Sequence, residues 1–303
     1  MNVEKMFAAI DTHVAGETFR MVVHSALQLN AQDLQAGKEK LLQKYEQERS
    51  LLLNEPRGHR AINGCIVTPS ATADYGLLFV NHENQSHFNY SGVVATLTAL
   101  LEMGNLDIKK DGIYQVETSN GVYDVQAECE GDVVEQVTVE SGPCQLVESQ
   151  PDYHTVAVEE SRHYLVCPLP ESIPSITMDY YYSILEWGSR TAGSLPEDST
   201  VQGIVLLERG SDGEVRSVTF DLEGAIVRSP GIDTTFAIYT VLLQEDDSLP
   251  QLVNHSIFGS FLKASRLPDS SVRFSIETQA FVTGEHQFIY NNADPLEKGF
   301  LLK

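Results

Sequence analysis

The sequence predicts an α/β (α+β) fold in two related lobes, each with a sheet wrapped around one buried helix. Three observations support this prediction. Strand-like and helix-like segments alternate in the first part of the chain, and period-2 hairpin patterns follow Gly112. In addition, one pattern of a turn followed by an apolar run occurs twice. Each copy follows a strand-rich block, so the N-terminus of each central helix is expected to face the other lobe.

The repeated pattern consists of a Gly-containing turn, then small residues and Thr, then an apolar run. Placing Gly92 on Gly231 gives an offset of 139, and Thr96 then falls on Thr235. The two segments are SGVVATLTALL (91–101) and PGIDTTFAIYTVLL (230–243). The repeat indicates a duplicated fold.

The first part of the chain is expected to form strands, a charged helix and an apolar helix. Charges interleaved with leucines at helical spacing predict the charged helix, which ends where Pro56 disfavours helix in the preceding residue. The expected strands are 7–14, 18–27 and 73–80, and the expected helices are 31–53 and 89–103.

The second part is expected to be richer in strands. Apolar alternation broken by SNG and EGD predicts antiparallel hairpins over 113–142. An amphipathic helix is expected over 178–188, while 234–244 fits either a helix or a buried strand. The other expected strands are 201–208, 215–227 and 272–291.

Composition argues against several classes of partner. Twenty Lys and Arg against 43 Asp and Glu give a net charge of -23, which repels phosphate backbones and anionic lipids. No signal peptide and no apolar run of roughly 20 residues is visible, so a cytoplasmic protein without membrane partners is expected. The four cysteines show no metal or disulfide spacing, so no metal site is expected; they are Cys65, Cys129, Cys144 and Cys167.

Five segments resemble motifs of the proline racemase family, which also contains hydroxyproline epimerases and trans-3-hydroxyproline dehydratases. DTHVAGETFR (11–20) resembles the family's DTH…GE…R motif, and NEPRGHRAING (54–64) matches its EPRGH motif closely. The other three are GAIVRSP (224–230), NHSIFGSF (254–261) and QAFVTGEHQFIYNNADPLEKGF (279–300). All five occur in the family's order along nearly the whole chain.

The resemblance implies a diaminopimelate-epimerase-like fold: two pseudo-symmetric lobes, each an open barrel-like, mostly antiparallel sheet around a central helix. The first lobe would comprise residues 1–123 and 287–303, and the second residues 124–286. The substrate would lie in a cleft between them, at the two helix N-termini. The resemblance also implies that no cofactor is used and, by analogy with family members, that the protein is a homodimer.

The family's mechanism depends on two thiols. One cysteine on each face of the substrate's α-carbon serves as acid or base, and backbone N–H groups of both turns hold the carboxylate. Thiols suit this task because their reference pKa of about 8.5 can be lowered at a helix N-terminus.

The first turn of this chain departs from that pattern. The family's MCGHG reads YSGVV (90–94) here. Ser91 therefore stands in place of the first cysteine, and Val93 in place of a substrate-binding histidine.

The second turn departs as well. The family's DRSPCGTGT reads VRSPGIDTT (227–235), so Gly231 stands where the second cysteine would be, or is the following glycine if one residue was deleted. Val227 replaces the Asp that pairs with the substrate's ring nitrogen. The resemblance thus excludes the two-thiol racemase mechanism for this chain.

Two polar residues remain as candidates for catalysis. Ser91 either caps its helix, for which serine is a preferred residue, or acts on substrate with His82, His87 or a residue of the other lobe as its base. Asp233 either complements the dipole of its helix or points into the cleft as a base or amine partner. Cys65 is expected to be a small buried core residue.

The other expected site residues bind the substrate or support the site. A buried Arg–Glu pair within EPRGH is a sufficient explanation for that motif. The expected substrate-binding residues are Gly92, Val93, Ser229, Gly231 and Ile232. The expected supporting residues are Asp11, His13, Glu55, Arg57, His59 and Arg228.

Two functions stay open on the sequence alone. The first is a divergent family enzyme acting at the α-carbon of proline, hydroxyproline or another small amino acid. Its chemistry would be dehydratase-like elimination or weak one-base isomerisation with Ser91 and Asp233, because elimination needs only one base at the α-carbon. The alternative is a catalytically inactive binder of a small carboxylate or amino acid.

Overall fold

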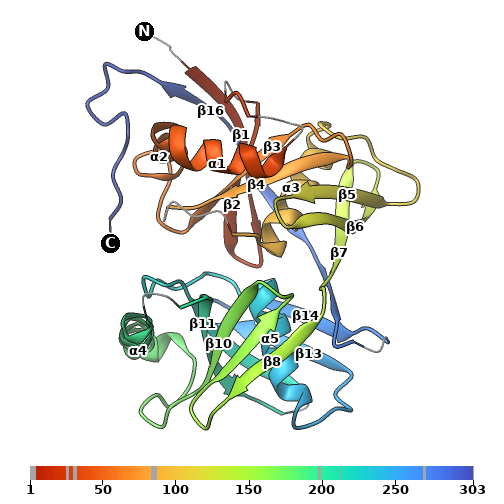
Figure 1. The fold of residues 1–303 in the computed structure, drawn as a ribbon, viewed down its shortest axis with the longest axis vertical. Coiled ribbons are helices and arrows are strands. Elements are labelled where there is room, and N and C mark those ends of the chain that lie inside the picture. The colour runs from red at the N-terminus through yellow and green to blue at the C-terminus, as the bar shows by residue number, and fades with distance from the viewer. Residues whose placement is uncertain are drawn as a thin grey trace. The chain divides into compact units, whose positions relative to one another are not determined.

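The structure, a computed structural model, describes residues 5–24, 27–29, 33–82, 87–196, 199–211, 213–268 and 271–302. The chain forms two compact units (Figure 1). The first unit contains Met1–Val137 and Gln279–Lys303, and the second contains Thr138–Thr278. The division falls inside one strand, β7 (Val133–Glu140), so no Pro- or Gly-rich linker marks it in the sequence.

The sheet of the first unit has the strand order β16-β1-β2-β3-β4-β5-β6-β7. Its other strands are β1 (Lys5–Val14), β2 (Glu17–His24), β3 (Ile62–Thr68), β4 (Tyr75–Val80), β5 (Ile113–Thr118), β6 (Gly121–Glu130) and β16 (Ala280–Tyr290). Its helices are α1 (Leu34–Lys44), α2 (Glu46–Leu53) and α3 (Tyr90–Glu102).

The sheet of the second unit has the order β15-β14-β13-β12-β11-β10-β9-β8. Its strands are β8 (Cys144–Ser149), β9 (His154–Val158), β10 (Arg162–Pro168), β11 (Val201–Arg209), β12 (Glu214–Phe220), β13 (Gln251–Ser256), β14 (Phe261–Arg266) and β15 (Phe274–Thr278). Its helices are the 3₁₀ turn η1 (Met178–Tyr180), α4 (Tyr181–Ser194) and α5 (Ile232–Leu243).

The two units repeat one topology. In the first, β1 and β2 are antiparallel, β2 and β3 parallel, β3 and β4 antiparallel, and β4 and β5 parallel. From β9 to β13 the second unit shows the same alternation. A parallel pair requires a crossover connection, and helices lie in these crossovers, α3 after β4 and α5 after β12. The duplicated, mostly antiparallel fold expected from the sequence is confirmed.

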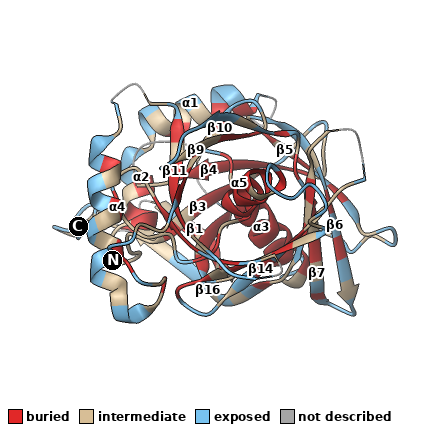
Figure 2. Ribbon diagram, turned by 90° about the horizontal axis from the view of Figure 1, so that it is seen from below, coloured by how far each residue is buried: buried red, intermediate tan, exposed pale blue. Residues whose placement is uncertain are grey.

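One helix in each unit is enclosed by that unit's own sheet. In α3 every residue from Tyr90 to Leu101 is buried, and α5 is buried over nearly its whole length. Helix α3 packs on β1, β2, β3 and β16, while α5 packs on β8, β9, β10, β11 and β14. Figure 2 shows both as red helices with strands around them. A helix that is apolar on all sides must be buried, so 234–244 forms a helix and not a strand.

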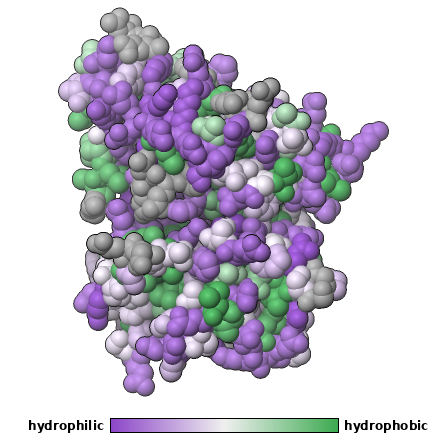
Figure 3. All heavy atoms as spheres, viewed as in Figure 1, coloured by the Kyte–Doolittle hydropathy of each residue, from purple (hydrophilic) through white to green (hydrophobic). Residues whose placement is uncertain are grey.

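The outer face of each sheet is covered by the remaining helices. Helices α1 and α2 pack on β4 and on β3 with β16, and α4 packs on β11. Strand β4, YGLLFV, is therefore buried at every position, whereas β6 buries only alternate residues along part of its length. None of the helices in the described ranges has the length and apolar content of a membrane span. Figure 3 shows polar side chains over much of one face, with apolar residues in scattered groups.

Several expected elements differ from the structure. The helix expected over 31–53 is divided at Tyr45. The ring of Tyr45 packs against the apolar cluster that includes Leu41 and Leu51, and its hydroxyl accepts the N–H of Gln28 at 3.1 Å. The strand expected over 215–227 ends at Phe220, because the following segment turns and only Ile226 bridges back. The expected elements 18–27 and 31–53 also include 25–26 and 31–32, which lie outside the described residues.

Gly188 fixes the approach of α4 to the sheet. A Cβ at Gly188 would lie 2.1 Å from Cε1 of Phe220, whereas Gly193 on the same helix has no atom within 4 Å of that position. We predict that Gly188→Ala lowers the free energy of unfolding by about 1–3 kcal/mol through overpacking. Gly193→Ala should raise it by up to about 1 kcal/mol, because alanine favours helix. Urea denaturation measures both, and equal effects of the two substitutions would contradict the packing described.

Candidate functional site

Helix α3 is capped by Asn89. Its Oδ1 accepts the N–H of Gly92 at 3.2 Å. Its amide is oriented by Glu17, whose Oε1 accepts Nδ2–H of Asn89 at 2.9 Å and Nδ2–H of Asn63 at 3.3 Å. The expected capping role of Ser91 is therefore wrong, because Ser91 lies inside the first turn.

The hydroxyl of Ser91 is hydrogen bonded to no base among the described residues. Ser91 is 1% exposed, and its Oγ has no hydrogen-bond partner within the described part of the chain. Both ring nitrogens of His82 are engaged elsewhere, with Asn54 Oδ1 and the carbonyl of His59, each at 3.1 Å. Burial lowers the pKa of both His82 and His87. Neither imidazole is hydrogen bonded to Ser91.

The first turn of α3 rests directly on the sheet. A Cβ at Gly92 would lie 2.8 Å from Cε1 of Phe79 and 3.3 Å from Sγ of Cys65, so glycine permits this close approach. Val93 is fully buried. Cys65 is also fully buried, and burial raises the pKa of its thiol to about 12. Cys65 is a protonated core residue at neutral pH, as expected.

The N-cap residue of helix α5 is Gly231, which has a φ of 73° and provides no side-chain cap. Its N–H donates to Ser229 Oγ at 3.0 Å, and its carbonyl accepts the N–H of Thr235 at 3.0 Å. Ile232 is buried, and its N–H has no acceptor within the described residues. Arg228 is exposed, and its guanidinium has no hydrogen-bond or ion-pair partner among the described residues.

Asp233, in the first turn of α5, is held by a buried arginine. Arg162, at the start of β10, donates Nε–H to Asp233 Oδ1 at 2.9 Å and an NH1 hydrogen to Glu159 Oε2 at 2.9 Å. Arg162 is 1% exposed and Asp233 is 6% exposed. The ion pair fixes the Asp233 carboxylate against the start of β10, at a helix terminus where a negative charge is favourable.

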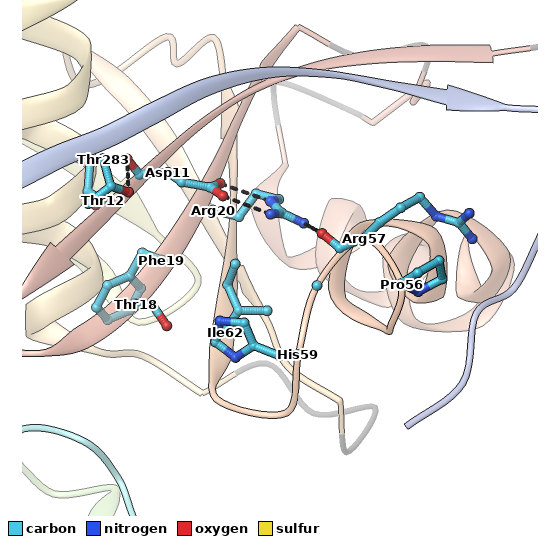
Figure 4. A pocket seen from close by; sticks show the side chains of 11 residues that line it. Asp11, Thr12, Thr18, Phe19, Arg20, Pro56, Arg57, His59, Ile62 and Thr283 are labelled. Carbon is cyan, nitrogen blue, oxygen red and sulfur yellow. Dashed lines mark hydrogen bonds and ion pairs between the residues drawn. The ribbon is translucent and has the colours of Figure 1, made fainter. Parts of the chain in front are cut away.

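In the first unit, the DTH…R motif forms a clamp around Arg20. Arg20 donates Nε–H to Asp11 Oδ1 at 2.9 Å and an NH2 hydrogen to Oδ2 at 2.7 Å. Its NH1 donates to the carbonyls of Leu52 and Arg57, the latter at 2.8 Å (Figure 4). The guanidinium lies 4.2 Å from the ring centroid of Phe288. The clamp joins β1 and β2 to the loop after α2.

The EPRGH segment is hydrogen bonded to residues 294–300. Arg57 extends away from Arg20 (Figure 4), donating to Asp294 Oδ2 at 3.3 Å and to both carbonyls of 296–297 at 2.8 Å. Glu55 pairs through its backbone with Phe300, at 2.9 Å in each direction. The Arg–Glu pair expected within this motif is therefore wrong, since Arg57 pairs with Asp294.

A cavity of about 220 Å³ lies inside the first unit beside this clamp (Figure 4). Asp11, Arg57 and His59 line it, and Nδ1 of His59 accepts the N–H of Ala61 at 3.2 Å. His13 does not line it; its ring stacks on Phe281 with centroids 5.3 Å apart. Of the expected supporting residues in the first unit, Asp11, Arg57 and His59 thus line this cavity, and His13 does not.

The proline racemase family model matches residues 9–159. A trans-3-hydroxy-L-proline dehydratase of Bacillus thuringiensis subsp. konkukian is 25% identical over 335 residues, which cover all of both chains. The chain belongs to the proline racemase family. A trans-3-hydroxy-L-proline dehydratase of Bacillus cereus is 26% identical, again over the full length of both chains.

The fold of this chain is similar to that of a solved structure. A hydroxyproline epimerase from Agrobacterium vitis, solved with bound trans-4-hydroxy-L-proline, is 20% identical with a TM-score of 0.83. The match covers 100% of this chain and 97% of that one. The two-lobed racemase-family fold expected from the motifs is thereby confirmed.

Three residues that the sequence analysis did not single out determine the geometry of the two turns: Glu17, Asn89 and Arg162. Asn89 could have been found, because Asn directly before an apolar run is as strong an N-cap signal as Ser. Glu17 lies within the DTH…GE motif, but nothing local links it to Asn89. Arg162 carries no signal, since 71 residues separate it from Asp233.

We predict that at most one of the four thiols reacts quickly with a disulfide reagent in the native protein. Burial raises the pKa of Cys65 and Cys167 to about 12 and that of Cys144 to about 11, so their thiolates are scarce. Cys129 is only partly buried. All four should react after denaturation, and rapid native labelling of Cys65, located by peptide mass spectrometry, would contradict the assignment.

We predict that Asp233→Asn lowers the free energy of unfolding by about 3 kcal/mol, because it removes one carboxylate partner from the buried guanidinium of Arg162. Glu186→Gln is the matched control. Its ion pair with Arg190 is exposed, with both side chains more than 70% accessible, and should contribute less than about 0.5 kcal/mol. Urea denaturation of both variants distinguishes them, and equal losses would show that the buried pair has no special structural role.

Proposed function

We propose that this chain binds a small carboxylate of the proline or hydroxyproline type at the N-terminal turns of α3 and α5, without the proton transfer of a racemase. The observation that carries the proposal is the ion pair of Asp233 with Arg162. Asp233 is the one acidic residue in the first turn of α5, and α3 has none in its first turn. With Oδ1 of Asp233 engaged at 2.9 Å, this carboxylate is occupied in a structural role.

Binding of a carboxylate is supported by what these turns still offer. The amino end of a helix presents N–H groups and a positive dipole to an anion. Arg228, three residues before Gly231, adds an exposed guanidinium to a chain of net charge -23. The trans-4-hydroxy-L-proline bound to the hydroxyproline epimerase of the same fold supports the ligand class. The cleft between the lobes stays a prediction from the resemblance.

The absence of catalysis is supported by the surroundings of Ser91. Removal of a proton from an α-carbon needs a base, and a hydroxyl serves as one only if a neighbour takes its proton. The ring nitrogens of His82 are hydrogen bonded to Asn54 Oδ1 and to the carbonyl oxygen of His59. His87 is not hydrogen bonded to Ser91. Each of the four cysteine thiols has a raised pKa, so no thiolate replaces the missing pair.

A dehydratase is the second candidate, and two observations favour it. The relatives from Bacillus carry the name trans-3-hydroxy-L-proline dehydratase, and Ser91 presents a hydroxyl without a partner in the described chain. In such an elimination a base removes the α-proton, the C2–C3 double bond forms as the bond between C3 and oxygen breaks, and the leaving hydroxyl takes that proton back from the base and departs as water. One base is sufficient for this reaction.

Calorimetry tests the binding proposal. L-Proline, trans-4-hydroxy-L-proline and trans-3-hydroxy-L-proline should bind, whereas prolinamide, which lacks the carboxylate, should not. We predict that Arg228→Ala weakens binding about tenfold, in the range of one hydrogen bond to a charged group. Arg190→Ala, on the exposed face of α4, should leave binding unchanged.

Two outcomes would contradict this assignment. If none of the three acids releases heat or raises the melting temperature, the chain is not a binder of this ligand class. If mass spectrometry shows loss of water from trans-3-hydroxy-L-proline, and Ser91→Ala abolishes it, the dehydratase replaces the binder.

A further inference from the structure

A buried chain of polar side chains ends at the first peptide of α5. Ser217 Oγ–H donates to Asn254 Oδ1 at 2.8 Å, and Nδ2–H of Asn254 donates to Thr235 Oγ1 at 3.0 Å. Thr235 Oγ1 in turn donates to the carbonyl of Gly231 at 2.6 Å. Ser217 is 1% exposed, and Asn254 and Thr235 are 0% exposed. All of these residues belong to the second unit.

The chain of hydrogen bonds has a fixed direction. A threonine hydroxyl has one proton to donate. Because Thr235 Oγ1 accepts the amide hydrogen of Asn254, its own proton is directed to the carbonyl of Gly231. Water does not compete for these groups, since all three side chains are buried.

The position of the Gly231 carbonyl determines the direction of the N–H of Ile232. A trans peptide is planar, so the carbonyl of Gly231 and the N–H of Ile232 point in opposite directions. The carbonyl accepts both the N–H of Thr235, at 3.0 Å, and its hydroxyl, so it points along the helix. The N–H of Ile232 therefore points out of the helix terminus, where the proposed carboxylate binds.

Helix α5 needs this arrangement more than α3 does. The N-terminus of α3 has a side-chain cap from Asn89, whereas Gly231 supplies no side chain to α5. Gly231 also has a φ of 73°, a region in which glycine alone is unrestrained, so the hydroxyl of Thr235 adds a restraint to the one that its own N–H places on this peptide. The equivalent threonine of the repeat, Thr96, makes the same type of bond, to the carbonyl of Gly92 at 2.7 Å, and its side chain is also hydrogen bonded to Cys65.

We propose that Thr235, oriented by Asn254 and Ser217, is a positioning residue for the carboxylate site. It acts by aiming the N–H of Ile232 at the ligand, and it touches no ligand itself. This inference rests on the proposed function, because it concerns the affinity of the same site.

Thr235→Val removes the hydroxyl and keeps the shape of the side chain. Thr240→Val is the matched control, since Thr240 is also buried in α5 and makes the same type of bond, to the carbonyl of Phe236 at 2.9 Å. Calorimetry with L-proline and trans-4-hydroxy-L-proline gives the dissociation constants, and thermal unfolding gives the stability of each variant.

We expect both valine variants to lose similar stability, while only Thr235→Val raises the dissociation constant, by about tenfold. Thr235→Ser restores the hydroxyl and should recover most of the affinity. Equal affinities of Thr235→Val and the wild type would overturn the positioning role and leave the proposed function intact. If the wild type binds neither probe, the proposed function fails and this inference fails with it.

Discussion

Each half of the structure depends on one constraint: an apolar helix must be surrounded by a sheet on every side. Helices α3 and α5 are buried along nearly their whole length, so the strands of each unit must curl around them. Backbone groups at the N-terminus of such a helix need partners. Asn89 supplies one at α3, whereas α5 has no side-chain cap and the N–H of Ile232 has no acceptor among the described residues.

The same constraint explains where the buried charges lie. In each unit an arginine in the second strand of the repeated topology, Arg20 in β2 or Arg162 in β10, is almost fully buried and paired with an aspartate. Arg20 also donates to two carbonyls, and Arg162 to a second carboxylate. A buried guanidinium needs such partners because its desolvation is costly. Asp233 is consequently part of the architecture of its unit.

The sequence was informative where a pattern is local. The repeated turn and apolar run predicted one buried helix in each unit, although 234–244 alone fitted either a helix or a buried strand. Alternation predicted the hairpin of β5 and β6. Strand β3 was missed because Asn63 and Gly64 have the character of turn residues. A Cβ at Gly64 would lie 2.4 Å from Cγ2 of Val80, so this glycine serves close packing between strands.

The site was harder to predict, because its decisive contacts join distant segments. Asn89 and Ser91 are both good cap residues, and the choice is made by Glu17, 72 residues before Asn89 in the chain. The pairing of Asp233 with Arg162 likewise arises only when α5 and β10 come together. Residue type and spacing located the two helix N-termini, and tertiary packing decided which contacts each side chain makes there.

The central claim is the proposal that the chain binds a proline-type carboxylate without moving its α-proton. Proton NMR of L-proline incubated with the protein in heavy water tests it most directly. The account predicts that the α-proton signal persists at the rate of loss seen in buffer alone. Loss of that signal well above the background rate, abolished by Ser91→Ala, would contradict it.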